Sequence, residues 1–237
     1  MDEFKISLST ADGKKDVLVR IKSRPRTRNF NMWINSDGEI TLSKPSYTPK
    51  SEAVEFIKSN VGWLESQLRN WKPKTPVSVW LAENPKIYAD AKEWKVWLRP
   101  ESTTPFTVED NLKSEVVFAF NSEESLKLLI VKFATERLTA AARRIADAAG
   151  LSFKRLSIRD QGGRWASMST TGTLSLNWRT IFLPEELQTY ILSHELAHTV
   201  FMNHSVSFWI FLNKICPGAK KLDKKLSDMS GRIFSIC

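Results

Sequence analysis

The first 45 residues alternate apolar and polar side chains, which is the pattern of half-buried strands. The alternating stretches are residues 4–8, 17–21, 30–34 and 40–42. The turn-forming pair Asp12-Gly13 separates the first two stretches, and Ser36-Asp37-Gly38 separates the last two. We therefore expect two β-hairpins at the start of the chain.

A helical period follows these strands. Apolar residues from Val54 to Trp71 recur at spacings of three and four, so they share one face of a helix. Thr48 is a suitable N-cap with Pro49 in the first helical position, and we expect one helix over residues 49–72. Three short strands are then expected at residues 77–81, 94–98 and 116–120.

The rest of the chain is richer in helical patterns. One helix is expected from Asn121, a candidate cap together with Glu124, to the stop signal Gly150. Two strands are expected at residues 156–159 and 173–177, and Pro184 followed by two glutamates marks the first turn of another helix.

These patterns indicate an α+β fold with two parts, and no internal repeat is evident. We expect a strand-rich part over residues 1–120, with its helix near 49–72, packed on a helix-rich domain over residues 121–237.

Composition and charge limit the class of protein. The 237 residues are 42% apolar and 26% charged, which excludes collagen-like, low-complexity and disordered chains. The net charge of +9 favours an anionic partner without identifying it. No apolar run reaches the length of a membrane helix and no signal-peptide pattern is seen, so we expect a cytoplasmic protein with no membrane partner. Cys216 and Cys237 lack metal-site spacing and are expected to be free thiols.

The three histidines of the chain all lie between residues 194 and 204, in the stretch HELAHTVFMNH. His194 and His198 are four residues apart, so a helix places them on one face, where two imidazoles can bind one zinc ion. Glu195 points about 100° around the helix, where it can reach a metal-bound water without binding the metal itself. This spacing predicts a catalytic zinc (Zn2+) site with Glu195 as the catalytic residue.

His204 is the candidate third ligand, six residues beyond His198. The chain must turn to bring this ring back, and Asn203 suits such a turn because Asn tolerates left-handed backbone. Ser205 is a candidate N-cap of a following helix. Three histidines and one water complete a tetrahedral site that leaves a position open to substrate.

Between residues 162 and 209 the sequence resembles the YgjP-like zinc metallohydrolases, which are relatives of the SprT-like minimal zincin peptidases. The motifs that carry the resemblance are Arg164-Trp165, Asn177-Trp178-Arg179, Pro184, His194 to His198, Asn203-His204-Ser205 and Phe208-Trp209. A weaker likeness in the opening arginine-rich strands extends it over most of the chain. The family commonly has Gly-Ser-Cys-Ser where this chain has Ala166-Ser167-Met168-Ser169, so any role of that cysteine is absent here.

The resemblance implies a zincin-like metallopeptidase domain at residues 121–237, with His194, His198 and His204 as zinc ligands and Glu195 as catalytic acid and base. It also implies that an extended peptide or protein substrate pairs with a strand beside the active helix. We expect the strand at residues 173–177 to have that role.

Two other substrate classes are compatible with the same metal site. A nucleoside triphosphate pyrophosphatase would use arginines to hold phosphates, and Arg164, Arg179 and the cations at alternate positions from Arg20 to Arg28 are candidates. A solvated strand face is the preferred interpretation of residues 20–28. A DNA-associated SprT-like protease would bind nucleic acid through basic strands and exposed aromatics, but most tryptophans, including Trp71 and Trp209, lie at periodic apolar positions typical of a core.

The surroundings of the site are less defined by the sequence. Tyr190 lies one turn before His194 and is expected to pack rather than to act at the site. Asp160, Glu186 and Asp228 are equivalent candidates for a supporting carboxylate. Lys220, Lys221, Lys224 and Lys225 are expected to form a solvated helix face.

Overall fold

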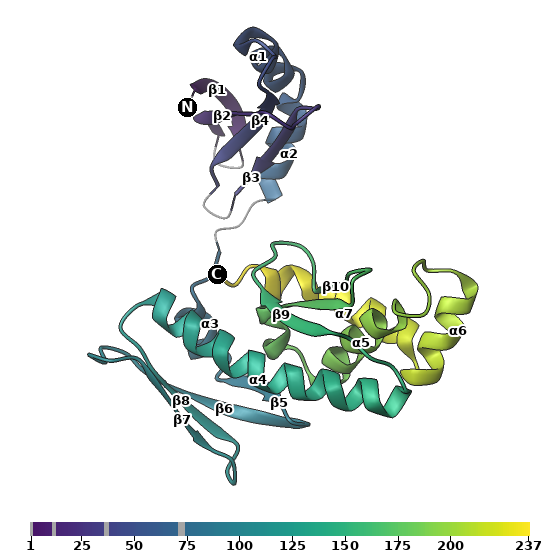
Figure 1. The fold of residues 1–237 in the computed structure, drawn as a ribbon. Coiled ribbons are helices and arrows are strands. Elements are labelled where there is room, and N and C mark those ends of the chain that lie inside the picture. The colour runs from purple at the N-terminus through teal and green to yellow at the C-terminus, as the bar shows by residue number, and fades with distance from the viewer. Residues whose placement is uncertain (1, 11–12, 36–37, 71–73) are drawn as a thin grey trace. The chain divides into compact units, whose positions relative to one another are not determined.

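The computed structural model describes residues 2–10, 13–35, 38–70 and 74–237, and it divides into two compact units (Figure 1). Unit 1 is Met1–Lys74 and unit 2 is Thr75–Cys237. The boundary that we expected near residue 120 falls inside unit 2 instead. The strands before residue 120 and the long helix after it share one hydrophobic core, in which Trp94 and Phe118 pack edge-on against Phe133.

Unit 1 contains a four-stranded sheet of mixed direction. Its strands are β1 (Asp2–Thr10), β2 (Gly13–Arg24), β3 (Asn31–Ile34) and β4 (Ile40–Pro45), in the order β1-β2-β4-β3. Both expected hairpins are present, and β2 and β4 pair in parallel at the centre of the sheet. The turn residues Asp12, Ser36 and Asp37 lie outside the described residues.

Two helices, rather than the single expected one, cover this sheet. They are α1 (Lys50–Ser59) and α2 (Val61–Asn70). The break is at Asn60, whose side chain donates to the backbone oxygen of Phe56 at 2.8 Å, a local bond of the kind that competes with helix formation. Thr48 is not the cap, because the N-cap position is Pro49, without a side-chain hydrogen bond. Ile57 and Leu64 are buried as the period predicted, while Trp71 lies outside the described residues.

Unit 2 begins with a helix where we expected a strand. The stretch Val77–Glu83 forms α3, in which Val77, Trp80 and Leu81 are buried on one face. The β-branched residues of this stretch favoured a strand, but the backbone N–H of Trp80 donates to Pro76 and the burial spacing is helical. The prediction of a strand was therefore wrong.

A second four-stranded sheet follows α3. It contains β5 (Lys86–Ala89), β6 (Lys92–Arg99), β7 (Phe106–Asp110) and β8 (Glu115–Ala119), in the order β5-β6-β8-β7. The strands at β6 and β8 were expected, whereas β5 and β7 were missed. The strand directions repeat those of unit 1: two antiparallel hairpins joined by a central parallel pair. The topology thus contains a repeat that the sequence does not reveal.

The long expected helix is α4 (Glu123–Ala149), which contacts both sheets of unit 2 (Figure 1). Its N-cap is Ser122, one residue after the expected Asn121, in a reciprocal capping box with Ser125. It ends at Gly150, whose φ of 64° is the left-handed conformation that glycine adopts easily.

The third sheet leads directly into the histidine helix. Its strands are β9 (Arg155–Arg159), β10 (Ala166–Met168) and β11 (Thr173–Asn177), in the order β10-β11-β9. The strand β11 continues into a 3₁₀ helix, η1 (Trp178–Phe182), and then into α5 (Glu185–Ala197). The chain closes with α6 (Val206–Ile215) and α7 (Ala219–Phe234).

Tryptophan side chains contribute to the core of unit 2, as their periodic apolar positions predicted. Trp80, Trp94 and Trp178 are buried, and Trp209 packs partly buried against the core of unit 2. Both cysteines are free. None of the described helices combines the length and the apolar character needed to cross a membrane.

Candidate active site

The helix α5 carries the candidate site at its C-terminal end. Its first turn contains Glu185 and Glu186, as expected, and most of its residues are buried. His194 and Glu195 lie in its last turn, and His198 is the C-cap residue, with φ −68° and ψ −13°. Because the backbone remains helical at His198, the spacing of four residues keeps its ring on the same side as that of His194.

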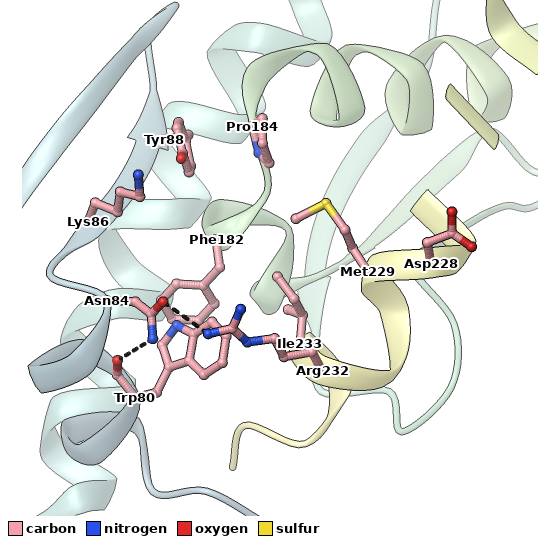
Figure 2. A pocket seen from close by; sticks show the side chains of 10 residues that line it. All are labelled: Trp80, Asn84, Lys86, Tyr88, Phe182, Pro184, Asp228, Met229, Arg232 and Ile233. Carbon is pink, nitrogen blue, oxygen red and sulfur yellow. Dashed lines mark hydrogen bonds between the residues drawn. The ribbon is translucent and has the colours of Figure 1, made fainter. Parts of the chain in front are cut away.

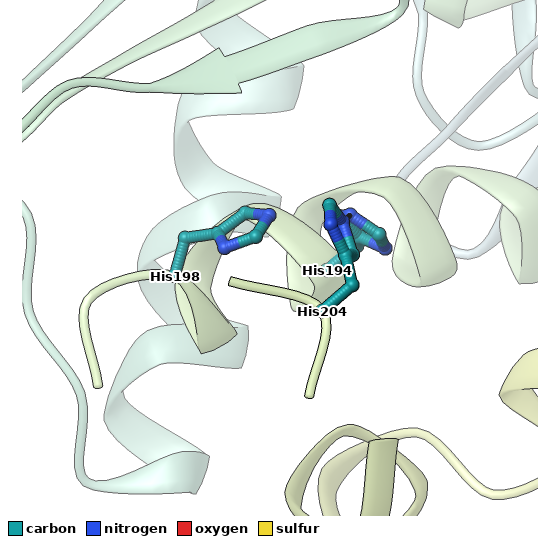
Figure 3. A group of neighbouring side chains, drawn as sticks. All are labelled: His194, His198 and His204. Carbon is teal, nitrogen blue, oxygen red and sulfur yellow. Dashed lines mark hydrogen bonds between the residues drawn. The ribbon is translucent and has the colours of Figure 1, made fainter. Parts of the chain in front are cut away.

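The three histidine rings converge, although His204 is ten residues from His194 (Figure 3). Ring centroids are separated by 5.1 Å for His194 and His198, 5.0 Å for His194 and His204, and 4.8 Å for His198 and His204. One ligand atom from each ring lies within 4.8 Å of the others. The grouping expected from the sequence is therefore present among the described residues.

The spacing of the nitrogen atoms fits a single metal ion. Two nitrogens bound at about 2.0–2.1 Å to one tetrahedral ion lie about 3.4 Å apart. The Nε2 atoms of His194 and His204 are 3.0 Å apart, which is close to this separation, and the ligand atom of His198 lies within 4.8 Å of the other two. Neutral imidazole nitrogens are also a suitable donor set for a divalent transition metal.

The return of His204 depends on the turn between α5 and α6. Asn203 does not adopt the left-handed conformation that we expected; its side-chain oxygen instead accepts a hydrogen bond from the backbone N–H of Ser205 at 3.3 Å. Ser205 is the N-cap of α6 and accepts from the backbone of Phe208. The centroid of the buried Phe208 ring lies 4.8–5.1 Å from the centroid of each histidine ring, so Phe208 provides an apolar contact shared by all three.

Two of the histidines are oriented by hydrogen bonds on the nitrogen that faces away from the cluster. The Nδ1 of His198 is 2.9 Å from the backbone oxygen of Phe201, which can only accept, so Nδ1 carries the proton. The Nδ1 of His194 is 3.3 Å from the hydroxyl oxygen of Tyr190, whose O–H donates to Asp223 at 2.8 Å. Both arrangements place the proton on Nδ1, so that the lone pair of Nε2 faces the cluster and can bind a metal.

The link from His194 through Tyr190 to Asp223 was missed in the sequence. Tyr190 does more than pack, since its hydroxyl contacts His194. Asp223 was not among the three candidate carboxylates: Asp160 binds Lys127 and Arg179, Glu186 pairs with Lys225, and Asp228 lies in another cavity. Asp223 is 29 positions after His194 and on α7, so only the packing of α7 against α5 brings it near.

Burial shapes the protonation of the site. It lowers the pKa of His194 to about 4, aided by the nearby His198 and His204, so the ring is neutral at pH 7 and able to donate a lone pair. It raises the pKa of Glu195 to about 7, although the backbone N–H of Met168 and the charge of Arg164 act in the opposite direction. Glu195 is only 9% exposed. Because its pKa is raised to near neutral pH, its carboxyl group can both accept and donate a proton there.

The arginines proposed to hold phosphates have different surroundings. Arg179 is fully buried and donates to the backbone oxygen of Ile236 at 2.7 Å and to Asp160 at 2.6 Å. It is therefore enclosed within the fold rather than open to a substrate. In unit 1, β2 ends at Arg24, so Arg26 and Arg28 do not continue the cationic strand face.

One larger cavity of unit 2 does not include the histidines. Figure 2 shows this space of about 380 Å³, which is lined in part by Trp80, Tyr88 and Arg232. The guanidinium of Arg232 lies 4.9 Å from the Trp80 ring and donates to Asn84. A second cavity of about 290 Å³ includes His198 and Met168 and is the one that adjoins the candidate site.

A helix with the His-Glu-x-x-His pattern and a third histidine on the following loop defines the class of metal-dependent hydrolases. The model of the YgjP-like, metallopeptidase domain family matches residues 28–229, and the chain belongs to this family. The family implies a divalent metal, and the three histidines fit one.

One solved structure is also similar to part of the chain. It is the metallopeptidase zymogen of Pyrococcus abyssi abylysin, with 31% identity over 39% of this chain and 94% of that chain. Its TM-score of 0.35 is too low to establish a common arrangement of the whole fold. No curated protein matches the chain.

Proposed function

We propose that this protein is a zinc-dependent peptidase in which His194, His198 and His204 hold the ion and Glu195 is the general base. The observation that carries the proposal is the convergence of the three imidazoles within 4.8 Å beside a buried glutamate, in a chain of a metallopeptidase family. Zinc held in this way supplies Lewis acidity, lowering the pKa of a bound water to about 7 and polarising a carbonyl.

Glu195 performs the proton transfers in this mechanism. Its buried carboxylate accepts a proton from the attacking water and returns it to the leaving amine, and its raised pKa suits both steps. The backbone N–H of Met168 holds the carboxylate in place. His194 and His198 are prevented from turning by the hydrogen bonds on their Nδ1 atoms.

The peptide substrate pairs with β10 in this proposal, and not with β11 as we first expected. The strand β11 is central in its sheet, with β10 and β9 on its two sides, so its backbone groups are already used. The strand β10 lies at the edge of the sheet, contacts α5, and contains Met168 next to Glu195. Strand addition at β10 therefore brings a peptide bond past the general base.

The two other substrate classes have less support. The burial of Arg179 removes one of the expected phosphate-binding groups, and the chain's family is one of metallopeptidases. Peptide or protein is accordingly the proposed substrate.

The metal is tested by elemental analysis of the purified protein and of His198→Ala. We expect one zinc ion per wild-type chain and almost none in the variant, because two imidazoles are a poor set for retention. Purified wild-type protein that contains no transition metal and takes up none from solution would refute the proposed mechanism.

The general base is tested with Glu195→Gln, with Glu186→Gln on the exposed part of the same helix as its matched control. Glu195→Gln is expected to keep its zinc and to lose about 10²–10⁴-fold in kcat for hydrolysis of an unstructured peptide mixture. The control should retain wild-type activity. Phosphate release from nucleoside triphosphates without any peptide cleavage would assign the other hydrolase class.

A further inference from the structure

Two cavities adjoin each other beside the candidate site. The first, of about 290 Å³, is lined on one side by Met168 and His198 and on the other by the loop after α4. The second, of about 450 Å³, extends along α4 and β9. Residues Ser152, Phe153 and Lys154 line both cavities. We call the two cavities together the basic groove; it runs from His198 to Arg143.

The walls of the basic groove carry three cations and a single acid. The cations are Arg143, Lys154 and Arg155, and the acid is Asp147. All three cations are exposed, and in the part of the chain that the structure describes none of them forms a salt bridge. Arg137, which is also on α4, differs because it is paired with Asp90 and Glu109. The positive charge of the groove is therefore available to a ligand.

Lys154 is the cation held closest to the histidine end. Its backbone N–H donates to the oxygen of Gly172 at 2.8 Å, which fixes the loop against the turn before β11. Its side-chain carbons lie over Gly172, where an added Cβ would be 3.2 Å from Cγ of Lys154. Gly172 has a φ of 81°, so this position favours glycine on both counts. The stem of Lys154 is thereby guided along the cavity that contains His198.

We propose that the basic groove binds acidic side chains of the peptide substrate next to the bond that is cleaved. This inference rests on the proposed peptidase function. A peptide that leaves the edge of β10 at Met168 enters the first cavity, where Phe153 and Met202 contact the aliphatic part of a glutamate and Lys154 pairs with its carboxylate. Arg143 and Arg155 lie further along the same path.

An acidic peptide fits these observations better than nucleic acid does. The groove offers three cations, whereas duplex binding relies on many phosphate contacts made together. His198 lines one end of the groove, so a side chain bound in the groove can belong to the same peptide that is cleaved at the histidine site.

The experiment compares cleavage of two peptide libraries by the zinc-loaded protein. The libraries share one neutral scaffold, and one of them carries a single glutamate at each position on either side of the cleaved bond. Wild type is expected to show about a fivefold higher kcat/KM for glutamate at one or two adjacent positions, as a partly exposed ion pair allows. Lys154→Glu should abolish or invert that preference, measured as the ratio of kcat/KM for the glutamate-containing and neutral peptides, because it replaces the pairing cation with an acid.

The matched control is Lys92→Glu, an identical charge change at an exposed position of β6 outside both cavities. It should keep the wild-type preference. Neutral peptides that are cleaved with no preference for acids, or a preference that Lys154→Glu leaves unchanged, would overturn this inference while the proposed peptidase function stands. A protein that cleaves no peptide would overturn both. Salt-sensitive retention on a DNA column that is lost in Lys154→Glu, together with no acid preference, would assign the groove to nucleic acid instead.

Discussion

Unit 2 contains two polar clusters that arise from neighbouring motifs but have opposite surroundings. The histidine cluster comprises His194, His198 and His204, and the arginine cluster comprises Arg179 with its partners Asp160 and Asn177. In the histidine cluster the outward-facing nitrogens of two rings are hydrogen bonded, and the inward-facing nitrogens meet one another. In the arginine cluster the donors bind groups of the fold itself, including the backbone oxygen of Ile236.

The polar groups of the histidine cluster remain available for chemistry, whereas those of the arginine cluster stabilise the fold. A buried charge is costly unless it is paired, and Arg179 is paired, with one guanidinium nitrogen left without a partner. In the histidine cluster, burial lowers the pKa of His194 to about 4, so this ring is neutral at pH 7 and keeps a lone pair for a metal. From the sequence, the histidines were the expected metal ligands and Arg179 was a candidate phosphate-binding group for the nucleotide alternative; the contacts of the two clusters differ accordingly.

Among variants of the two clusters, Arg179→Met is expected to change the protein most. The change removes donors from Ile236, Asp160 and Asn177 in a fully buried position, and we expect a loss of about 3 kcal/mol in the free energy of unfolding. Denaturant unfolding measures it, with the exposed Arg232→Met as control at under about 1 kcal/mol. Zinc content of the folded variant should remain at the wild-type level; a zinc-free folded variant would mean that the two clusters are not separate.

A smaller effect is expected from Tyr190→Phe, which acts on the other cluster. Loss of the hydroxyl removes the hydrogen bond to His194 and leaves the packed ring in place, so we expect zinc affinity to fall about tenfold with little change in stability. Competition with a chromogenic chelator measures the affinity. Tyr88→Phe, in the cavity without histidines, is the matched control. Equal affinities of wild type and Tyr190→Phe would show that the link to Asp223 does not orient the ring.

The smallest effect concerns acid stability. Burial alone would raise the pKa of Asp160, but hydrogen bonds from Lys127 and Arg179 hold it well below the ordinary value of 3.8. A carboxyl with a lowered folded-state pKa stabilises the protein above its unfolded-state value and loses that contribution as the pH falls below about 4. Because Asp160 is about half exposed, the contribution is about 1 kcal/mol or less.

Thermal melting of wild type and Asp160→Asn from pH 7 to pH 2.5 checks this expectation. The variant should melt at a lower temperature at pH 7, and the two curves should approach each other below pH 4. A difference in melting temperature that stays constant over the whole range would attribute the effect to packing rather than to the charge.

Local patterns in the sequence were sufficient for many elements. Alternation predicted all four strands of unit 1, and the cap and stop signals placed α4 within two residues. The predictions failed where local preference and tertiary packing disagree. At Val77–Glu83 the β-branched residues favour a strand, but the stretch forms a helix that buries Val77, Trp80 and Leu81 on one face. At Asn60 a side-chain hydrogen bond interrupts a periodic apolar stripe that continues on both sides.

The spacing of His194, Glu195 and His198 was enough to predict their directions, because a helix converts spacing along the chain into direction in space. The return of His204 to the other two rings, and the surroundings of all four residues, depend instead on how the elements pack. Three features depend on contacts between segments that are far apart in the chain: the hydrogen bond to Asp223, the edge position of β10 and the basic groove. Local sequence patterns do not predict such contacts. The burial of Arg179 belongs to the same category, since a side chain's environment depends on every element that packs against it.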